Sequence, residues 1–277
     1  MKTKLIIFEG GDCCGKTTML DKVFDTLNTF GYKCGKWKFP NYDGLYGQEI
    51  LDHLKNFKVE GSTKDKIFKE LMDFSEKQYL NKLAAFDKFI KWVIDGDYDY
   101  VLLDRFTLSQ YCYDVAWFKI LDTETWIKNI DKLAVDIDSN IDDGIYYTRK
   151  VIDNLYNRAS IIMNSYRLVF PKIYIFIFGQ NPYVKAIVNS KNTGRRVDKY
   201  DSFTDYQEEV NRLMQDMAKD MNLCGHEAYI IDPKKMMEIR EGITDYNDHN
   251  HVIVDNALFH YTDSVIKLIT HEVTKND

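Results

Sequence analysis

The 277-residue chain has few prolines, no long hydrophobic run and no excess of positive charge. No stretch of about 18 apolar residues occurs, so we expect no membrane-spanning segment. Lysine and arginine number 37 against 43 aspartates and glutamates, a net charge of −6. That balance argues against a surface that binds duplex nucleic acid. With only four prolines and no repeat or low-complexity linker to divide the chain, we expect one domain over residues 1–277.

The five cysteines are odd in number and fit no disulfide framework. No secretory signal is visible, so we expect free thiols in a reducing compartment, the cytoplasm, or the host cytoplasm if the source is viral. One cysteine and three histidines lie near one another in the sequence, at Cys224, His226, His249 and His251. Their spacing matches no standard zinc pattern, which favours a polar loop over a metal site.

Apolar runs and helical spacings alternate along the chain. Runs typical of buried strands occur at residues 5–8, 36–40, 101–104, 172–178, 228–231 and 252–254. Helical spacings occur at residues 18–27, 46–57, 65–94 (in two pieces), 109–120, 151–168, 181–188, 203–221 and 257–273. Residues 121–150 and 233–250 look irregular. Strands that alternate with helices predict an α/β fold, with a parallel central sheet and helices on both faces.

One eight-residue stretch fits the phosphate-binding pattern G-x-x-x-x-G-K-[ST]. It consists of Gly10, Gly11, Asp12, Cys13, Cys14, Gly15, Lys16 and Thr17, and Thr18 follows. Between a strand and a helix, such a loop points backbone N–H groups at phosphate oxygens. We expect Lys16 to reach the β- and γ-phosphates of ATP and the Thr17 hydroxyl to bind Mg²⁺. The two adjacent cysteines could also form a redox switch. That the loop tolerates small side chains at these positions explains them better.

Four segments make the chain resemble thymidylate kinase, a family of P-loop nucleoside monophosphate kinases, as a divergent member of viral type. They are 8–18, Phe39-Pro40 with Gly47, Asp104-Arg105-Phe106 with Ser109, and 194–200 with Gln207. The resemblance covers roughly residues 1–120 and 165–275. It implies the three-layer αβα fold of P-loop NTPases, with a mobile lid near 190–201 and insertions near 121–165 and 225–250. Relatives are commonly homodimers, so a homodimer is expected.

The resemblance implies phosphoryl transfer from ATP–Mg²⁺ to a deoxynucleoside 5′-monophosphate, with dTMP as the first candidate. Such a transfer depends on positioning and charge neutralisation more than on covalent chemistry. Asp104 would bind Mg²⁺ together with Thr17, and Arg105 would hold the acceptor phosphate in a forked hydrogen bond. The phosphate loop lacks an arginine that some relatives carry there. Arg195 or Arg196 of the lid would therefore cover the transferring phosphoryl group, unless both simply belong to a solvated loop.

The resemblance also implies an acceptor site, made of Asp12, Phe39, Pro40, Tyr42, Phe74, Gln78, Arg105, Ser109, Tyr113 and Tyr200. Asp12 would bind the 3′-hydroxyl and Phe74 would stack on the base. Tyr42 and Gln78 stand where relatives often carry arginines. The Gln78 amide still offers a donor and an acceptor to a pyrimidine, and Lys77 is a candidate to replace the lost charge. Ordinary core packing remains the alternative for each aromatic residue, and a solvated loop acid for Asp12.

Three other functions stay open at this point. A deoxynucleoside kinase would phosphorylate a free nucleoside, although Arg105 and the Phe39-Pro40 segment favour a monophosphate acceptor. A broader monophosphate kinase would accept dUMP or modified pyrimidine nucleotides. A non-catalytic nucleotide-binding module remains open because Tyr42 and Gln78 replace family arginines. In that case Asp104 and Arg105 could form no more than a surface ion pair.

Overall fold

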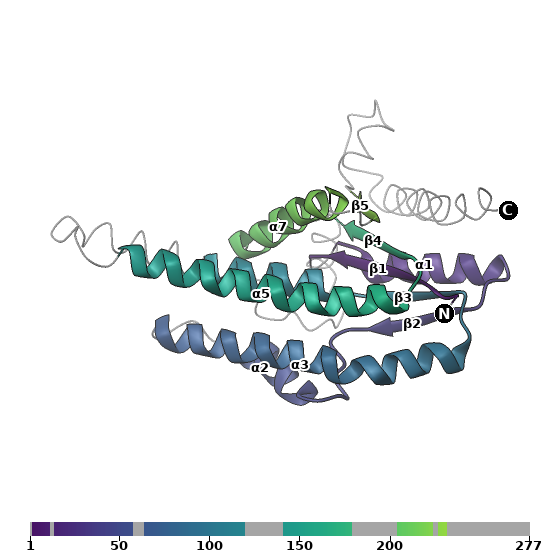
Figure 1. Ribbon diagram of the computed structural model, residues 1–277, viewed down its shortest axis with the longest axis horizontal. Coiled ribbons are helices and arrows are strands. Elements are labelled where there is room, and N and C mark those ends of the chain that lie inside the picture. Colours follow the sequence, from purple (N-terminus) through teal and green to yellow (C-terminus); the bar gives the residue numbers. More distant parts are fainter. Residues whose placement is uncertain are drawn as a thin grey trace, which may run out of the picture.

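A computed structural model describes residues 2–11, 14–57, 64–119, 141–178, 204–223 and 227–231. Within these residues, parallel strands form a five-stranded sheet in the order β2-β3-β1-β4-β5 (Figure 1). The strands are β1 (Lys4–Gly10), β2 (Cys34–Lys38), β3 (Tyr100–Asp104), β4 (Ile173–Phe178) and β5 (Glu227–Ile231). The parallel sheet predicted from the sequence is confirmed. Because β1 is central, the residues that follow it lie between those that follow β3 and β4.

Helices cover both faces of the sheet, so the fold has three layers. They are α1 (Lys16–Thr29), α2 (Gly47–Asn56), α3 (Lys64–Gly96), a helix over residues 107–119, α5 (Ile141–Val169) and α7 (Thr204–Leu223). Successive β1 side chains point to opposite faces. Ile6 and Phe8 pack in one cluster with α1, and Leu5 and Ile7 pack in the other with α3, the helix over 107–119, α5 and α7.

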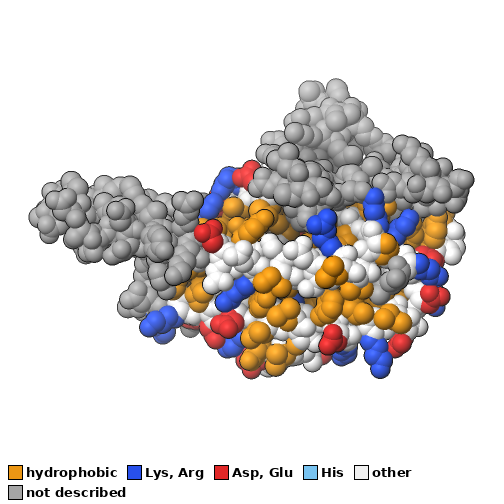
Figure 2. All heavy atoms as spheres, viewed as in Figure 1, with side chains coloured by type: hydrophobic (Ala, Val, Ile, Leu, Met, Phe, Trp, Pro, Cys, Tyr) orange, Lys and Arg blue, Asp and Glu red, His pale blue; other side chains and the backbone are white. Residues whose placement is uncertain are grey.

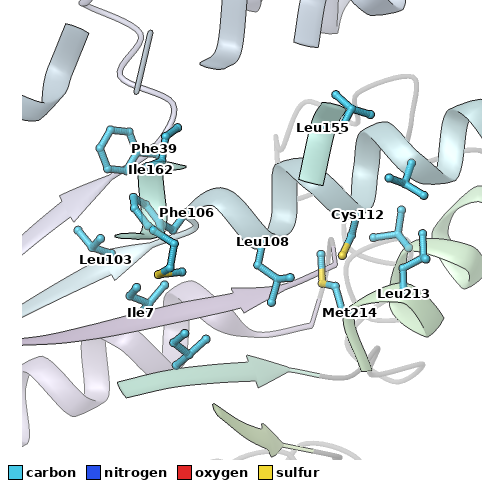
Figure 3. Packing of buried hydrophobic residues seen from close by; sticks show 14 of the residues in the cluster. Ile7, Phe39, Leu103, Phe106, Leu108, Cys112, Leu155, Ile162, Leu213 and Met214 are labelled. Carbon is cyan, nitrogen blue, oxygen red and sulfur yellow. The ribbon is translucent and has the colours of Figure 1, made fainter. Parts of the chain in front are cut away.

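The two helices that follow β1 and β3 therefore lie on opposite faces of the sheet. In an open parallel sheet, adjacent connections that leave in opposite directions create a crevice at the carboxyl ends of the strands, where ligands bind. The larger core cluster packs on the face of the sheet that carries α3, the helix over 107–119, α5 and α7. Figure 3 shows Ile7 and Leu103 of the sheet beside Phe106 and Leu108, with Ile162 of α5 above them. Each fully buried large apolar side chain of this cluster stabilises the fold by about 1.5–3 kcal/mol.

Two predictions about helices are wrong. Residues 65–94 were expected as two helical pieces, but α3 is one helix. The apolar spacing is interrupted because polar Ser75, Asn81 and Lys82 are buried on this helix, where they serve the site described below. Residues 141–150, expected to be irregular, belong to α5. Local helix propensity is a weak guide, because the tertiary context of a helix can override it. The segments expected at 181–188, 252–254 and 257–273 lie outside the described residues.

The described surface carries apolar side chains among mixed charges. In Figure 2 hydrophobic side chains gather on the face turned to the viewer, with lysine, arginine and acidic side chains around them. Ile161 and Leu168 of α5 are 55% and 90% exposed, one heptad apart. The homodimer expected from the resemblance stays a prediction. None of the helices in the described part of the chain combines the length and hydrophobicity needed to cross a membrane.

Candidate active site

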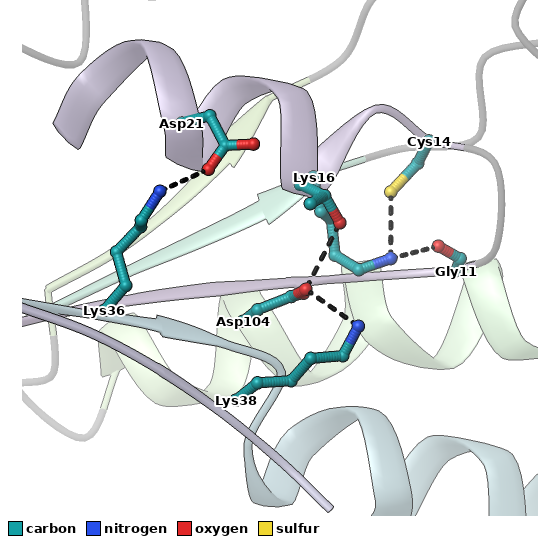
Figure 4. Close-up of polar contacts among 8 residues, drawn as sticks. Gly11, Cys14, Lys16, Asp21, Lys36, Lys38 and Asp104 are labelled. Carbon is teal, nitrogen blue, oxygen red and sulfur yellow. Dashed lines mark hydrogen bonds and ion pairs between the residues drawn. The ribbon is translucent and has the colours of Figure 1, made fainter. Parts of the chain in front are cut away.

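The phosphate loop joins the end of β1 to the start of α1, as the sequence predicts. Gly15 precedes α1 with φ of 86°, a left-handed conformation that glycine adopts without a steric penalty. Lys16 is buried, and its Nζ donates hydrogen bonds to the carbonyl oxygen of Gly11 at 2.6 Å and to Sγ of Cys14 at 3.5 Å (Figure 4). The lysine thus lies back along the loop. Cys14 is a buried free thiol, and Asp12 and Cys13 lie outside the described residues.

The side chains of Thr17, Asp104 and Lys38 meet beside the loop. The Thr17 hydroxyl donates to Oδ2 of Asp104 at 3.2 Å, and Lys38 Nζ lies 3.4 Å from the same oxygen (Figure 4). The strand register explains the meeting, because Phe8 pairs with Asp104 and Asp104 pairs with Lys38 across three neighbouring strands. The sequence predicted Thr17 and Asp104, but not Lys38.

These residues fit a magnesium ion. Mg²⁺ prefers oxygen ligands, and nucleotide sites hold it with one or two side chains while phosphates and waters complete the shell. A hydroxyl at a helix N-terminus beside a nearly buried carboxylate is such a set. The described residues contain no group of three acidic, histidine or cysteine side chains that could hold a metal alone. An ion here would therefore depend on the substrate for its other ligands.

Arg105 follows Asp104 but turns towards a different region. Its backbone has φ of 65°, which is uncommon for a residue other than glycine and is typical of functional sites. Its N–H donates to the Phe8 carbonyl oxygen at 3.0 Å. Its guanidinium carbon lies 5.4 Å from the centre of the Tyr113 ring. The turn therefore separates the two side chains: the carboxylate meets Thr17, and the guanidinium enters a neighbouring cavity.

That cavity has a volume of about 220 Å³ and brings the predicted acceptor residues together. It is lined by Lys38, Phe39, Pro40, Tyr42, Leu54, Leu71, Phe74, Gln78, Lys82, Arg105, Phe106, Ser109, Gln110, Tyr113, Asp114, Trp117 and Tyr206. Every predicted acceptor residue that the structure describes is in this set. Asp12 and Tyr200 lie outside the described residues, as do the predicted lid and its Arg195 and Arg196. The residues come from five separate segments, at 38–42, 54, 71–82, 105–117 and 206, so the cavity exists only in the folded chain.

Several lining residues were not predicted from the sequence. They are Lys38, Lys82, Gln110, Asp114, Trp117 and Tyr206, besides three apolar residues. A signal was available for two of them, since residues four apart on a helix share a face. Lys82 stands four residues after the predicted Gln78, and Trp117 stands four after the predicted Tyr113. Tyr206 carried no such signal, because α7 enters the site from the far end of the chain.

A buried polar network forms one wall of the cavity. Lys82 Nζ donates to Oε1 of Gln110, Gln110 Nε2 donates to the Ser75 carbonyl oxygen at 3.1 Å, and Ser75 Oγ donates to Asp114 Oδ2 at 2.6 Å. Burial lowers the pKa of Lys82 to about 8, although Asp114 and Glu9 favour its charged form. Burial raises the pKa of Asp114 to about 6. The network therefore holds one cation and one carboxylate in contact with the cavity near neutral pH.

Glu9 has no predicted role, yet it positions this wall. Its carboxylate accepts hydrogen bonds from the backbone N–H groups of Leu108 and Ser109, at 3.0 and 3.3 Å, and from the Ser109 hydroxyl. Burial raises the pKa of Glu9, and these hydrogen bonds oppose the rise. A carboxylate at a helix N-terminus stabilises the first turn. Glu9 thus fixes the helix over 107–119, and the hydroxyl of Ser109 serves that cap while its side chain lines the cavity.

The loop after β2 is held by α3. Asn81 accepts a hydrogen bond from the Asn41 N–H at 2.9 Å, and its Nδ2 donates to the carbonyl oxygens of Asn41 and Leu45. Gly47 approaches Tyr42 so closely that a Cβ would lie 1.9 Å from the Tyr42 carbonyl oxygen. Any larger residue at position 47 would displace the loop. These contacts hold the loop whose residues Phe39, Pro40 and Tyr42 line the cavity.

Phe74 and Lys77 differ in their relation to the cavity. One face of the Phe74 ring stacks on His53, with ring centres 3.8 Å apart. Burial lowers the pKa of His53 to about 4, so the imidazole is neutral at physiological pH. Lys77 instead pairs with Asp73 at 2.7 Å on α3 and does not line the cavity. The hypothesis that Lys77 replaces the missing arginine charge therefore finds no support in the geometry.

Comparisons with known proteins give a likeness in fold alone. No protein-family model matches the sequence, and no curated protein matches it. Solved structures do match, among them thymidylate kinase from Ehrlichia chaffeensis. That structure is 18% identical in sequence and has a TM-score of 0.46; the match covers 83% of this chain and 92% of that chain. At this level of similarity the functional argument depends on the geometry described above.

Proposed function

We propose that the protein transfers the γ-phosphoryl group of ATP–Mg²⁺ to the phosphate of a deoxynucleoside 5′-monophosphate, with dTMP as the first candidate acceptor. The observation that supports this most directly is how the two halves of the site are joined. Lys38 pairs with Asp104 beside the phosphate loop and also lines the cavity, and Arg105 continues from Asp104 into the cavity. A donor on the loop would therefore face an acceptor in the cavity.

The charges of the cavity support an acceptor that is already an anion. Three of the described lining residues are cations (Lys38, Lys82 and Arg105), whereas Asp114 is the single carboxylate among them. A phosphate acceptor needs cations to hold it and carries its own ionised oxygen as nucleophile. A hydroxyl acceptor needs a general base within reach. Asp114 is buried and already hydrogen-bonded to Ser75, so it is a poor base for that purpose.

In this proposal each side chain has one task. Lys16 moves from the loop carbonyl to the transferring phosphoryl group and stabilises the charge that develops on its oxygens. Thr17 and Asp104 hold Mg²⁺, which when bound neutralises charge on the phosphates of ATP. Arg105 grips the acceptor phosphate with two parallel hydrogen bonds, and its contact with the Tyr113 ring restricts the guanidinium before substrate arrives. Phe74 stacks on the base.

A coupled assay with ATP and a panel of dTMP, dUMP, dGMP, a 5-modified pyrimidine monophosphate and free thymidine tests the proposal. Turnover of a monophosphate and none of thymidine is the expected result. Turnover of thymidine without dTMP would assign the protein to the deoxynucleoside kinases instead. Nucleotide binding by calorimetry with no turnover of any acceptor would leave only a binding module. The gene product in magnesium-containing buffer and the same sample with EDTA give the metal control.

A further inference from the structure

Lys82 is a lysine that α3 buries against the cavity. It is 2% exposed and lines the cavity together with Gln78 and Gln110. An ammonium group has three donors, and within the described residues one hydrogen bond of Lys82 is found, to Oε1 of Gln110. Burying a cation with unused donors is costly unless a partner completes its shell. The structure therefore pairs a desolvated cation with a cavity into which a ligand oxygen would fit.

The neighbours of Lys82 favour a neutral partner oxygen over a second carboxylate. Asp114, which interacts favourably with the ammonium charge, is already hydrogen-bonded to Ser75. Arg105, on the same cavity, disfavours the ammonium form and is assigned to the acceptor phosphate. The cation on α3 and the cation after β3 thus have different partners to serve. Phe74 and Gln78, the residues expected to contact the base, lie on α3 and line the cavity together with Lys82. We therefore expect the oxygen that Lys82 binds to belong to the base.

We propose that Lys82 selects the acceptor base by donating a hydrogen bond to a ring carbonyl oxygen, so that the site prefers keto bases to amino bases. This inference rests on the proposed function. Uracil, thymine and guanine present a carbonyl oxygen where cytosine and adenine present an amino group. An amino group facing an ammonium group sets donor against donor and leaves both unsatisfied in a desolvated site. Lys82 therefore takes the part first considered for Lys77, from the opposite face of α3.

The test compares kcat/KM for dUMP with that for dCMP, and kcat/KM for dGMP with that for dAMP. In both pairs the keto nucleotide should have the higher value, whether the base is a pyrimidine or a purine. In the native protein we expect kcat/KM ratios of roughly 10 to 100 within each pair, the range for a hydrogen bond to a charged group. Lys82→Met puts an unbranched side chain one heavy atom shorter in the same place and removes the donors. It should bring both ratios close to one, mostly through KM for the keto nucleotide. Lys77→Met, on the same helix but outside the cavity, should leave both ratios unchanged.

Three results separate this inference from a structural role and from the proposed function. Ratios that stay at the native value in Lys82→Met, or an equal loss for all four nucleotides, would overturn the inference while the kinase assignment stands. Lys82→Arg keeps a cation at position 82, so this variant should retain a keto preference that Lys82→Met lacks. If Lys82→Met does not fold, as thermal unfolding would reveal, Lys82→Gln takes its place and should narrow the ratios, because an amide can also accept. If the native protein turns over no nucleotide, the proposed function fails, and calorimetric Kd ratios for the same pairs decide the role of Lys82.

Discussion

The phosphate loop and the acceptor cavity occupy adjacent positions at the carboxyl ends of the strands, but they are built in different ways. The loop is one continuous stretch. Gly15 adopts the left-handed conformation that the loop requires, and Lys16 donates a hydrogen bond to the carbonyl oxygen of Gly11 in the same loop. The cavity collects side chains from five segments that lie up to about 170 residues apart, from Lys38 to Tyr206. Local chemistry thus suffices for the loop, whereas the cavity needs the sheet and four helices in place, α2, α3, the helix over 107–119 and α7.

The largest effect should come from breaking the loop. In Lys16→Ala the cation that acts on the transferring phosphoryl group is lost, so we expect kcat to fall by roughly 100-fold or more. The matched control is Lys36→Ala, which removes a lysine that pairs with Asp21 on the surface of α1 (Figure 4). Initial rates at saturating ATP and acceptor measure both variants. An unchanged kcat in Lys16→Ala would remove the loop from the mechanism.

Breaking the junction between loop and cavity should affect one substrate and spare the other. Arg105→Ala removes the fork proposed to hold the acceptor phosphate, so KM for the monophosphate should rise by roughly 10- to 100-fold and the rate should fall. ATP affinity should change little, because Asp104 and Thr17 keep their hydrogen bond. Calorimetry with a non-hydrolysable ATP analogue and steady-state kinetics give the two readings. An equal loss of ATP affinity would show that Arg105 does not serve the acceptor.

The same contrast explains how far sequence alone reaches. The strand–loop–helix unit was predictable because its signals are local: an apolar run, glycines at fixed spacing and a helical period. Asp104 was predictable because an apolar run that ends in a carboxylate is typical of a parallel strand whose carboxyl end meets a site, whereas the role of Arg105 came from the resemblance. Glu9 escaped prediction, since nothing in its own segment says that its partners are the N–H groups of Leu108 and Ser109, about 100 residues away. Tyr206 escaped for the same reason.

On α3 the sequence pattern misled in the opposite way, because it predicted a break in the helix that does not exist. Ser75, Asn81 and Lys82 broke the apolar pattern and suggested an interruption in the helix, although α3 is continuous. Their hydrogen bonds to Asp114, Asn41 and Gln110 replace the apolar contacts that the pattern lacks. A break in periodicity within an otherwise strong helix was therefore the sign of a binding wall. Sequence rules that weigh only apolar spacing treat such a wall as a loop.

A change of pH should sharpen the comparison, because the cavity contains a lysine whose pKa is shifted towards neutrality. Burial lowers the pKa of Lys82 to about 8, while Asp114 and Glu9 oppose the shift and Arg105 reinforces it. The ammonium form is therefore lost as pH rises through this value, and KM for a keto nucleotide should increase roughly 10-fold between pH 7 and pH 9. Asp114, whose pKa is raised only to about 6, is already ionised in this window.

Lys82→Arg provides the control for the pH experiment, because an arginine keeps its proton throughout this range. Its KM for dUMP should stay flat from pH 7 to pH 9 while the native value rises. The KM for ATP should respond to pH in the same way in both proteins, since position 82 lines the cavity and is not part of the phosphate loop. A parallel rise of the KM for dUMP in the two proteins would place the titrating group elsewhere and remove Lys82 as the cause.

The smallest effect, and the finest probe of the cavity, is expected from Gln78→Arg. A cation at position 78 should favour dTMP over amino-base nucleotides, but Lys82 stands four residues further along α3 and lines the same cavity. Like charges at this spacing repel by about 0.2–0.5 kcal/mol, a factor of about 1.4 to 2.3, so the gain in selectivity should be only about 4- to 7-fold. In the Lys82→Met background the repulsion is gone and the new cation acts alone, so the same substitution should raise the keto preference by roughly 10-fold.

A double-mutant cycle on the dUMP-to-dCMP ratio measures this coupling. Additive effects would mean that Gln78 and Lys82 do not address one base edge, and an unchanged ratio in both backgrounds would show that Gln78 does not contact the base.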